Sequence, residues 1–102
     1  MSDPVKAITS RIDRRCGALA TTVLGRSESD PWQSLTFDGG RHQIELRFSG
    51  LRIDDALDAL REEIGGPDFA IPGHMIAEIR ISGIERSDGE ALVRLDAMTI
   101  AN

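Results

Sequence analysis

A strict alternation of apolar and polar residues near the C-terminal end limits the fold of this chain more than any other feature. Every second position of residues 91–99 is apolar or small: Ala91, Val93, Leu95, Ala97 and Thr99. Successive side chains of a β-strand point to opposite faces of a sheet, so the pattern predicts a strand with one face against the core. Residues 75–81 repeat the alternation, and their odd-numbered side chains are expected to face the same core.

The turn between these two strands decides which side chains of the first strand face the core. We expect a three-residue loop, Ser87-Asp88-Gly89, because it brings the odd-numbered positions of both strands to one face. A two-residue turn at residues 88–89 is the alternative; it shifts the pairing by one residue and needs a bulge, which Gly83 could provide. The three-residue loop directs four side chains of the first strand inward: Met75, Ala77, Ile79 and Ile81.

The opposite face of this ribbon is expected to be polar in the middle and apolar at both ends. The same loop pairs Ile76 with Ile100 near one end and Arg80 with Asp96 in the middle. Apolar side chains that pair on adjacent strands form a patch, and such patches on small domains commonly mark interfaces. We predict an interface on this face, together with Trp32, that consists of Ile76, Ile84, Leu92, Met98 and Ile100. The alternative is that the N-terminal segment of the chain covers these residues.

The first segment of the chain has the three- and four-residue apolar spacing of an amphipathic helix. We expect this helix to extend over residues 4–24 and to end at Gly25. Its apolar stripe consists of Val5, Ile8, Ile12, Cys16, Leu19 and Val23. Gly17 and the Thr21-Thr22-Val23 run disfavour a helix, so a hairpin that turns near residues 14–17 is the alternative.

A second helix is predicted over residues 53–64, with Gly65 or Gly66 ending it. Its expected core side chains are Ile53, Ala56, Leu57, Leu60 and Ile64.

A hairpin is predicted between the two helices, with strands over residues 32–37 and 41–50. We expect it to turn at Asp38-Gly39-Gly40, and residues 27–31 to form a polar loop before it. The core positions of this hairpin are expected to be Leu35, Phe37, Ile44, Leu46 and Phe48.

The resulting order, α-β-β-α-β-β, predicts one α+β domain over residues 1–102. A four-stranded antiparallel sheet with both helices on one face accounts for it. This order matches a circular permutation of the ferredoxin-like βαββαβ unit, a likeness of topology that implies no function.

Composition argues against several classes of partner. The net charge is −5, and the chain has four aromatic residues and no tyrosine, so nucleic acid is not an expected partner. Cys16 is the only cysteine, which excludes an internal disulfide and fits a reducing cytoplasm. The first 15 residues lack the apolar segment of a signal peptide, and no apolar run approaches the roughly 20 residues of a membrane helix.

The candidates for chemistry are few. His74 follows a Pro-Gly turn and His42 begins a strand; each is a candidate ligand-binding group, with a turn-anchoring or rim histidine as the alternative. Cys16 lies on an apolar stripe and is expected in the core. No phosphate-loop, dinucleotide or calcium motif is present, and the histidines and cysteine are too few for a Cys/His zinc site. We therefore predict no catalytic residue, cofactor or metal.

Three functions remain open from the sequence. The first is a non-enzymatic module that self-associates through its sheet face as a two-fold dimer. The second is a small-molecule binder or enzyme whose pocket, between sheet and helices, uses His74 or His42. The third is a subunit of a larger assembly, in which a basic contact face of Arg11, Arg14 and Arg15 meets an acidic protein partner or the acidic body of the chain itself.

Overall fold

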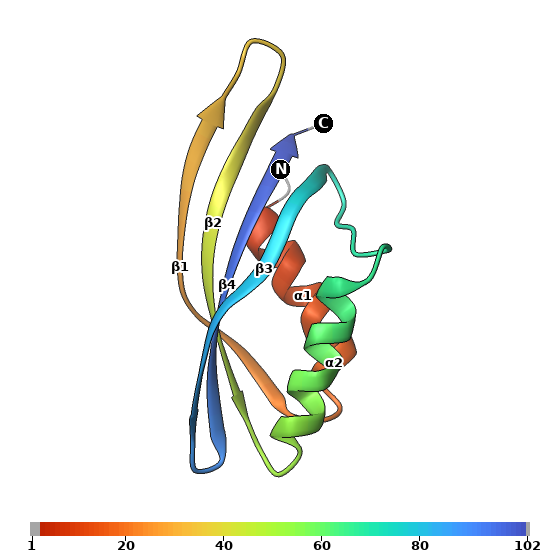
Figure 1. Ribbon diagram of the computed structural model, residues 1–102, viewed down its shortest axis with the longest axis vertical. Coiled ribbons are helices and arrows are strands. Elements are labelled where there is room, and N and C mark those ends of the chain that lie inside the picture. The colour runs from red at the N-terminus through yellow and green to blue at the C-terminus, as the bar shows by residue number, and fades with distance from the viewer. Residues whose placement is uncertain (1–2, 102) are drawn as a thin grey trace.

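The computed structural model describes residues 3–101, which form two helices and one four-stranded antiparallel sheet. The elements are α1 (Pro4–Cys16), β1 (Thr21–Gln33), β2 (Asp38–Ser49), α2 (Ile53–Gly65), β3 (His74–Ser87) and β4 (Glu90–Ala101). The strands lie in the order β1-β2-β4-β3, and both helices cover one face of the sheet (Figure 1). The predicted α+β class is confirmed. Strands β2 and β3 are joined through α2 with β4 between them, which is the split βαβ arrangement of the permuted ferredoxin-like topology.

The core lies between the two helices and the central strands. The alternation in β2 and β4 places Ile44, Leu46 and Phe48 opposite Leu95, Val93 and Ala91, and all six are at most 1% exposed. The helices add Val5, Ile8, Ile12 and Cys16 from α1 and Ile53, Ala56, Leu57, Ala59 and Leu60 from α2. These helix residues form one core with the strands, with Leu19 and Ile64 packed at its margin, whereas Val23 of the predicted first stripe lies outside it.

Helix α1 ends earlier than predicted. The side chain of Asp3 accepts a hydrogen bond from the backbone N–H of Val5 at 3.0 Å, which caps the first turn. The helix stops at Cys16, and residues 21–23 begin β1 instead of completing a fourth and fifth turn. β-Branched side chains favour the extended conformation, so the helical spacing of Val23 was coincidental; its side chain is 54% exposed. Neither a helix to residue 24 nor a hairpin at residues 14–17 is correct.

The first hairpin turns four residues earlier than the glycine pair indicates. Residues 27–31, predicted as a loop, belong to β1, and the turn is made by residues 34–37. The hydroxyl of Ser34 accepts a hydrogen bond from the N–H of Phe37 at 3.0 Å, and Leu35 and Phe37 project into solvent instead of the core, at 108% and 53% exposure. The hairpin end extends well past the helices (Figure 1); residues 31–40 are called the hairpin arm below.

The second hairpin has the two-residue turn, and the predicted three-residue loop is wrong. Ser87 pairs with Glu90, and Gly89 has a φ of +70°. The register shifts between Ile81 and Gly83, where the bulge expected for that alternative lies, and it shifts again between Ile76 and Glu78. The second shift has no counterpart in the prediction. It places Met75 and Ala77 in exposed positions, although both were expected in the core.

Gly39 is needed for close approach of two backbones, which is a different role from the turn that it was predicted to make. A Cβ atom at this position would lie 2.0 Å from the carbonyl oxygen of Thr99 and 2.9 Å from the indole of Trp32. We expect Gly39→Ala to lower the free energy of unfolding by about 1–3 kcal/mol, measured by urea denaturation. Gly65→Ala is the matched control, because a Cβ atom there meets nothing within 4 Å. Equal stability of the two variants would contradict this role.

Candidate functional site

Both helices lie on one side of the sheet and leave its other face uncovered (Figure 1); this face is called the outer face below. Directly opposed residues of neighbouring strands share a face, so the register gives its composition. One row at the end of this face consists of Trp32 of β1, Gly39 of β2, Ile100 of β4 and Met75 of β3. Met98 lies in the next row. These four side chains, Trp32, Met75, Met98 and Ile100, are called the apolar end.

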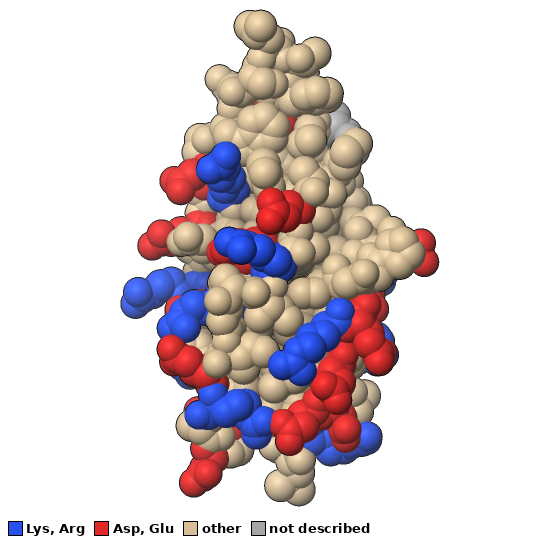
Figure 2. Space-filling view, in the orientation of Figure 1, with Lys and Arg blue, Asp and Glu red and all other residues tan. Residues whose placement is uncertain are grey.

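The apolar end is continuous with the hairpin arm. Leu35 and Phe37 are exposed at the tip of the arm, and Met75 is 55% exposed at the opposite edge of the sheet. On the side shown in Figure 2, charged side chains gather over the body of the protein, and this upper end has almost none. The molecule is therefore asymmetric along its length, with charge concentrated away from the arm.

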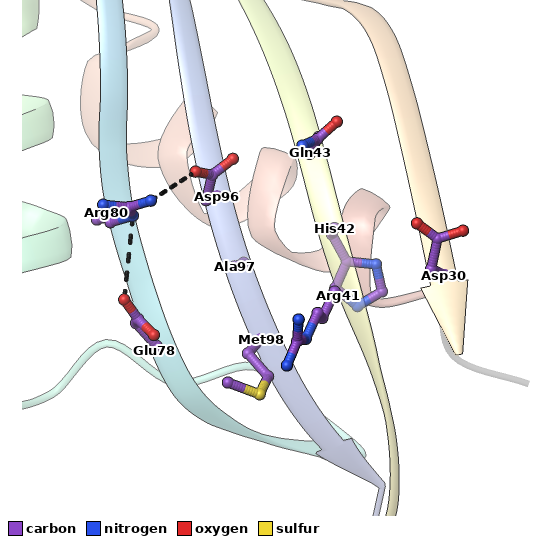
Figure 3. A pocket seen from close by; sticks show the side chains of 9 residues that line it. All are labelled: Asp30, Arg41, His42, Gln43, Glu78, Arg80, Asp96, Ala97 and Met98. Carbon is purple, nitrogen blue, oxygen red and sulfur yellow. Dashed lines mark hydrogen bonds and ion pairs between the residues drawn. The ribbon is translucent and has the colours of Figure 1, made fainter. Parts of the chain in front are cut away.

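A shallow depression of about 480 Å³ lies beside the apolar end, in the middle of the outer face. Figure 3 shows Arg41 and Met98 next to each other in it, with Arg80 between two carboxylates. The guanidinium of Arg80 lies 3.2 Å from a carboxylate oxygen of Asp96 and 4.0 Å from one of Glu78. All three side chains are at least one-third exposed, so these ion pairs contribute little stability, roughly 0–1 kcal/mol each.

The rows further from the arm are also charged. Arg94 lies 3.0 Å from an oxygen of Glu85 and 3.5 Å from one of Glu45, and the hydrogen bond to Glu85 raises the pKa of its guanidinium. In the following row, Arg47 of β2 separates the apolar residues Val23 and Leu92.

The predicted interface residues divide between the two faces. Leu92, Met98 and Ile100 lie on the outer face and are partly exposed, as expected. The placement of Ile76 and Ile84 there is wrong: they pair with the buried residues Thr99 and Val93 and pack against the core. The error at Ile84 follows from the two-residue turn, which shifts the pairing by one residue from Ser87 to Gly83. The bulge between Ile81 and Gly83 restores the predicted pairing, and the error at Ile76 follows from the second bulge, between Ile76 and Glu78. The same shift brings Met75 to the outer face, and no sequence signal at Ala77 indicated it.

Both histidines line one cavity on the helix side of the sheet, near the start of α1. The cavity has a volume of about 340 Å³, and Pro4, Ser29, Gly40 and Thr99 also line it. His42 and His74 lie on β2 and β3, separated by β4. The sequence named both residues as candidates for a pocket between sheet and helices, but nothing in it indicated that they would share one.

His42 is held in place at both ring nitrogens. Its Nδ1 lies 2.7 Å from the hydroxyl oxygen of Ser29 and its Nε2 lies 3.0 Å from that of Thr99, and the side chain is 5% exposed. A Cβ atom on Gly40 would lie 2.9 Å from the imidazole, so glycine lets the ring lie against the strand. His42 is thus a buried residue instead of the rim histidine of the alternative. His74 differs, because its Nδ1 is buried without a hydrogen-bond partner among the described residues.

Burial lowers the pKa of His42 below its ordinary value of about 6.5, because the protonated ring is poorly solvated there. The nearby His74 lowers this pKa further, and Asp3 opposes the change.

The stability of the fold is expected to depend on pH through His42. Below about pH 6.5 the unfolded chain binds a proton at this ring, and the folded protein binds it only at lower pH. The free energy of unfolding should therefore fall as the pH decreases from about 6.5 toward the folded-state pKa, and it should not depend on His42 above that range. Urea denaturation between about pH 7.5 and pH 5 measures this, with His42→Gln expected to remove the fall and His74→Gln to reduce it without removing it, because burial is the larger cause of the lowered pKa of His42. An unchanged slope in His42→Gln would contradict the assignment.

The other candidate residues are used within the fold. Cys16 is fully buried, as predicted, its thiol lies 3.5 Å from the carbonyl oxygen of Ala56, and burial raises its pKa. Arg11 donates to Glu63 at 2.6 Å and lies 5.3 Å from the ring centre of Phe69, and Arg15 donates to Glu62 at 3.0 Å. Two arginines of the predicted basic face therefore bind acidic residues of α2. Arg14 is exposed and forms no ion pair with residues 3–101.

Among the described residues, no three His, Cys, Asp or Glu side chains gather as a metal site would require. Neither helix has the length and the apolar character needed to cross a bilayer. Comparisons of the chain with protein-family models, with curated proteins and with solved structures gave no match in any of the three.

Proposed function

We propose that this protein is a non-enzymatic interaction module that self-associates through the outer face of its sheet as a two-fold dimer. The observation that carries the proposal is the apolar end, which crosses the whole width of the sheet and continues into the exposed Leu35 and Phe37 of the hairpin arm. Contiguous apolar surface of this kind on a small domain commonly marks an interface.

The edges of the sheet are poorly suited to the alternative, in which a second copy extends the sheet. Edge strand β1 contains Pro31 and has a register shift between Leu24 and Ser27. Edge strand β3 has two register shifts. Proline removes a backbone donor and bulges twist an edge away from a neighbour, so both features resist strand addition. Association through the face avoids these obstacles.

The apolar end would supply most of the affinity. Burying an exposed large apolar side chain is worth about 1.5–3 kcal/mol, whereas an exposed ion pair contributes about 0–1 kcal/mol. A two-fold interface uses each side chain twice, so even partial burial of the apolar end in both copies gives a substantial term. The charged middle of the face would then govern specificity more than strength.

Self-association is tested by the mass of the protein in solution. We expect light scattering to give a mass that rises from one to two chains with increasing concentration. Met75→Lys and Met98→Lys should each yield a folded monomer, because a buried lysine at the interface is costly. Leu51→Lys is the matched control: Leu51 is equally apolar and 105% exposed, but it lies in the loop between β2 and α2. A wild-type protein that stays monomeric at millimolar concentration would overturn the proposal.

The histidine cavity supports a second candidate function, binding of a small molecule. The observation in its favour is the buried Nδ1 of His74, which has no partner among residues 3–101, and His74 lines the cavity together with Ser29 and Thr99. We expect a thermal-shift screen of small carboxylic acids and amines to find compounds that raise the melting temperature. His74→Gln should abolish that rise and Leu51→Lys should leave it unchanged. A rise that persists in His74→Gln would place the binding elsewhere.

A further inference from the structure

We infer that, in the dimer proposed above, the two-fold axis runs parallel to the strands, so that β1 of each copy faces β3 of the other and Glu28 meets Arg80 of the second copy. This inference rests on the proposed self-association and adds its geometry.

Two sheets that pack face to face in an aligned manner lie about 10 Å apart, with strand directions within about 30° of each other. A two-fold axis between them then lies in the plane of the interface, either along the strands or across them. An axis along the strands keeps the rows level and places β1 over β3 and β2 over β4. An axis across the strands places each strand over its own copy and reverses the rows end to end.

The register fixes which residues occupy each row of the outer face. Each row is given in the strand order β1, β2, β4, β3, starting at the arm. The first row is Trp32, Gly39, Ile100 and Met75, the second is Asp30, Arg41, Met98 and Glu78, and the third is Glu28, Gln43, Asp96 and Arg80. At the level of the bulges the fourth row has only Glu45 of β2 and Arg94 of β4, and the fifth row is Val23, Arg47, Leu92 and Glu85. The last row contains Thr21, Ser49, Glu90 and Ser87.

An axis along the strands joins the first rows of the two copies, so that Trp32 covers the exposed Met75 of the second copy. Met98 and Leu92 then face Arg41 and Arg47 of the second copy, whose aliphatic stems can cover them. The charged residues that oppose each other are Glu28 with Arg80, Glu45 with Arg94, and Asp30 with Glu78. Two of these three contacts are attractive, and symmetry repeats each of them.

An axis across the strands joins surfaces that do not match. When the two faces overlap fully, the apolar end covers the last row, so that Ile100 lies on Glu90 of the second copy. An axis shifted to the apolar ends joins them but leaves the lower rows of both faces uncovered. Arg41 would face Arg47 and Glu78 would face Glu85, which places like charges together. The favourable contacts of Asp96 with Arg94 and Met98 with Leu92 remain, but the apolar end, which supplies the affinity, would bury polar groups. Charge and apolar complementarity therefore favour the axis along the strands.

Glu28 and Arg80 give a contact that only the second copy can make. Within one chain they occupy opposite edges of the sheet, three strand spacings or about 14 Å apart, so they cannot pair directly. Glu28 forms no ion pair with residues 3–101, and Arg80 forms only exposed ones. Any energetic coupling between the two positions must therefore act between copies.

The experiment is a charge exchange measured by sedimentation velocity. We expect Glu28→Arg alone and Arg80→Glu alone each to weaken self-association by about tenfold or more, because each homodimer then contains two contacts between like charges. An equimolar mixture of the two variants should form heterodimers with nearly wild-type affinity, because both contacts become opposite in sign. Arg14→Glu, a charge reversal on α1, is the control and should behave as wild type. Circular dichroism of each variant checks that it is folded.

The outcomes separate the two proposals. If the wild type dimerises but the mixture associates no better than either variant alone, the orientation is overturned and the proposed self-association stands. If the wild type is monomeric, the self-association fails, and the orientation fails with it. Recovery of the dimer in the mixture supports both.

Discussion

The pairing of β3 with β4 determines how the rest of this structure is divided between core and surface. A strand has only two faces, so one extra residue exchanges every side chain beyond it. Two such residues are present in β3, so the two ends of the strand, Gly83–Ser87 and His74–Ile76, have one phase and the segment between the bulges has the opposite phase. Ile84 and Ile76 are thereby turned toward the helices, and Met75 is turned away from them. The composition of the outer face, and with it every proposal about function, depends on this local pairing.

Features of the sequence that are set by periodicity could be predicted. The stripe of the second helix, the first four residues of the first stripe (Val5, Ile8, Ile12 and Cys16) and the alternation of Ile44, Leu46 and Phe48 depend on burial along one regular element, and the structure confirms them. Leu19 and Val23, the last two residues of the first stripe, lie outside the helix. The extents of the first helix and the first hairpin could not be predicted, because they depend on contacts with other elements. Gly39 resembles a turn residue in isolation, and its actual role is visible only when the backbone of Thr99 lies beside it. The shift at Ala77 likewise has no local signal, whereas a shift near Gly83 was expected as the bulge that a two-residue turn needs.

The candidate sites, too, could be predicted only where they do not depend on contacts between elements. Sequence reasoning named both histidines but treated them as separate, since residues 42 and 74 become neighbours only through the strand order. It also left open whether the arginines of the first helix serve an external partner. The ion pairs of Arg11 and Arg15 with Glu63 and Glu62 show that α1 and α2 are joined by charge at their exposed margin as well as by apolar contact beneath it. The excess of positive charge in the first segment is thus partly explained by packing alone.

The burial of Cys16 has a practical consequence for studying motion in this protein. The thiol, on the last residue of α1, is buried against α2, and burial raises its pKa, which favours the unreactive protonated form. A thiol reagent can modify it only while the helices separate from the sheet. The labelling rate therefore reports the frequency of that opening with the chain's own single sulfhydryl as the probe, and no engineered cysteine is required.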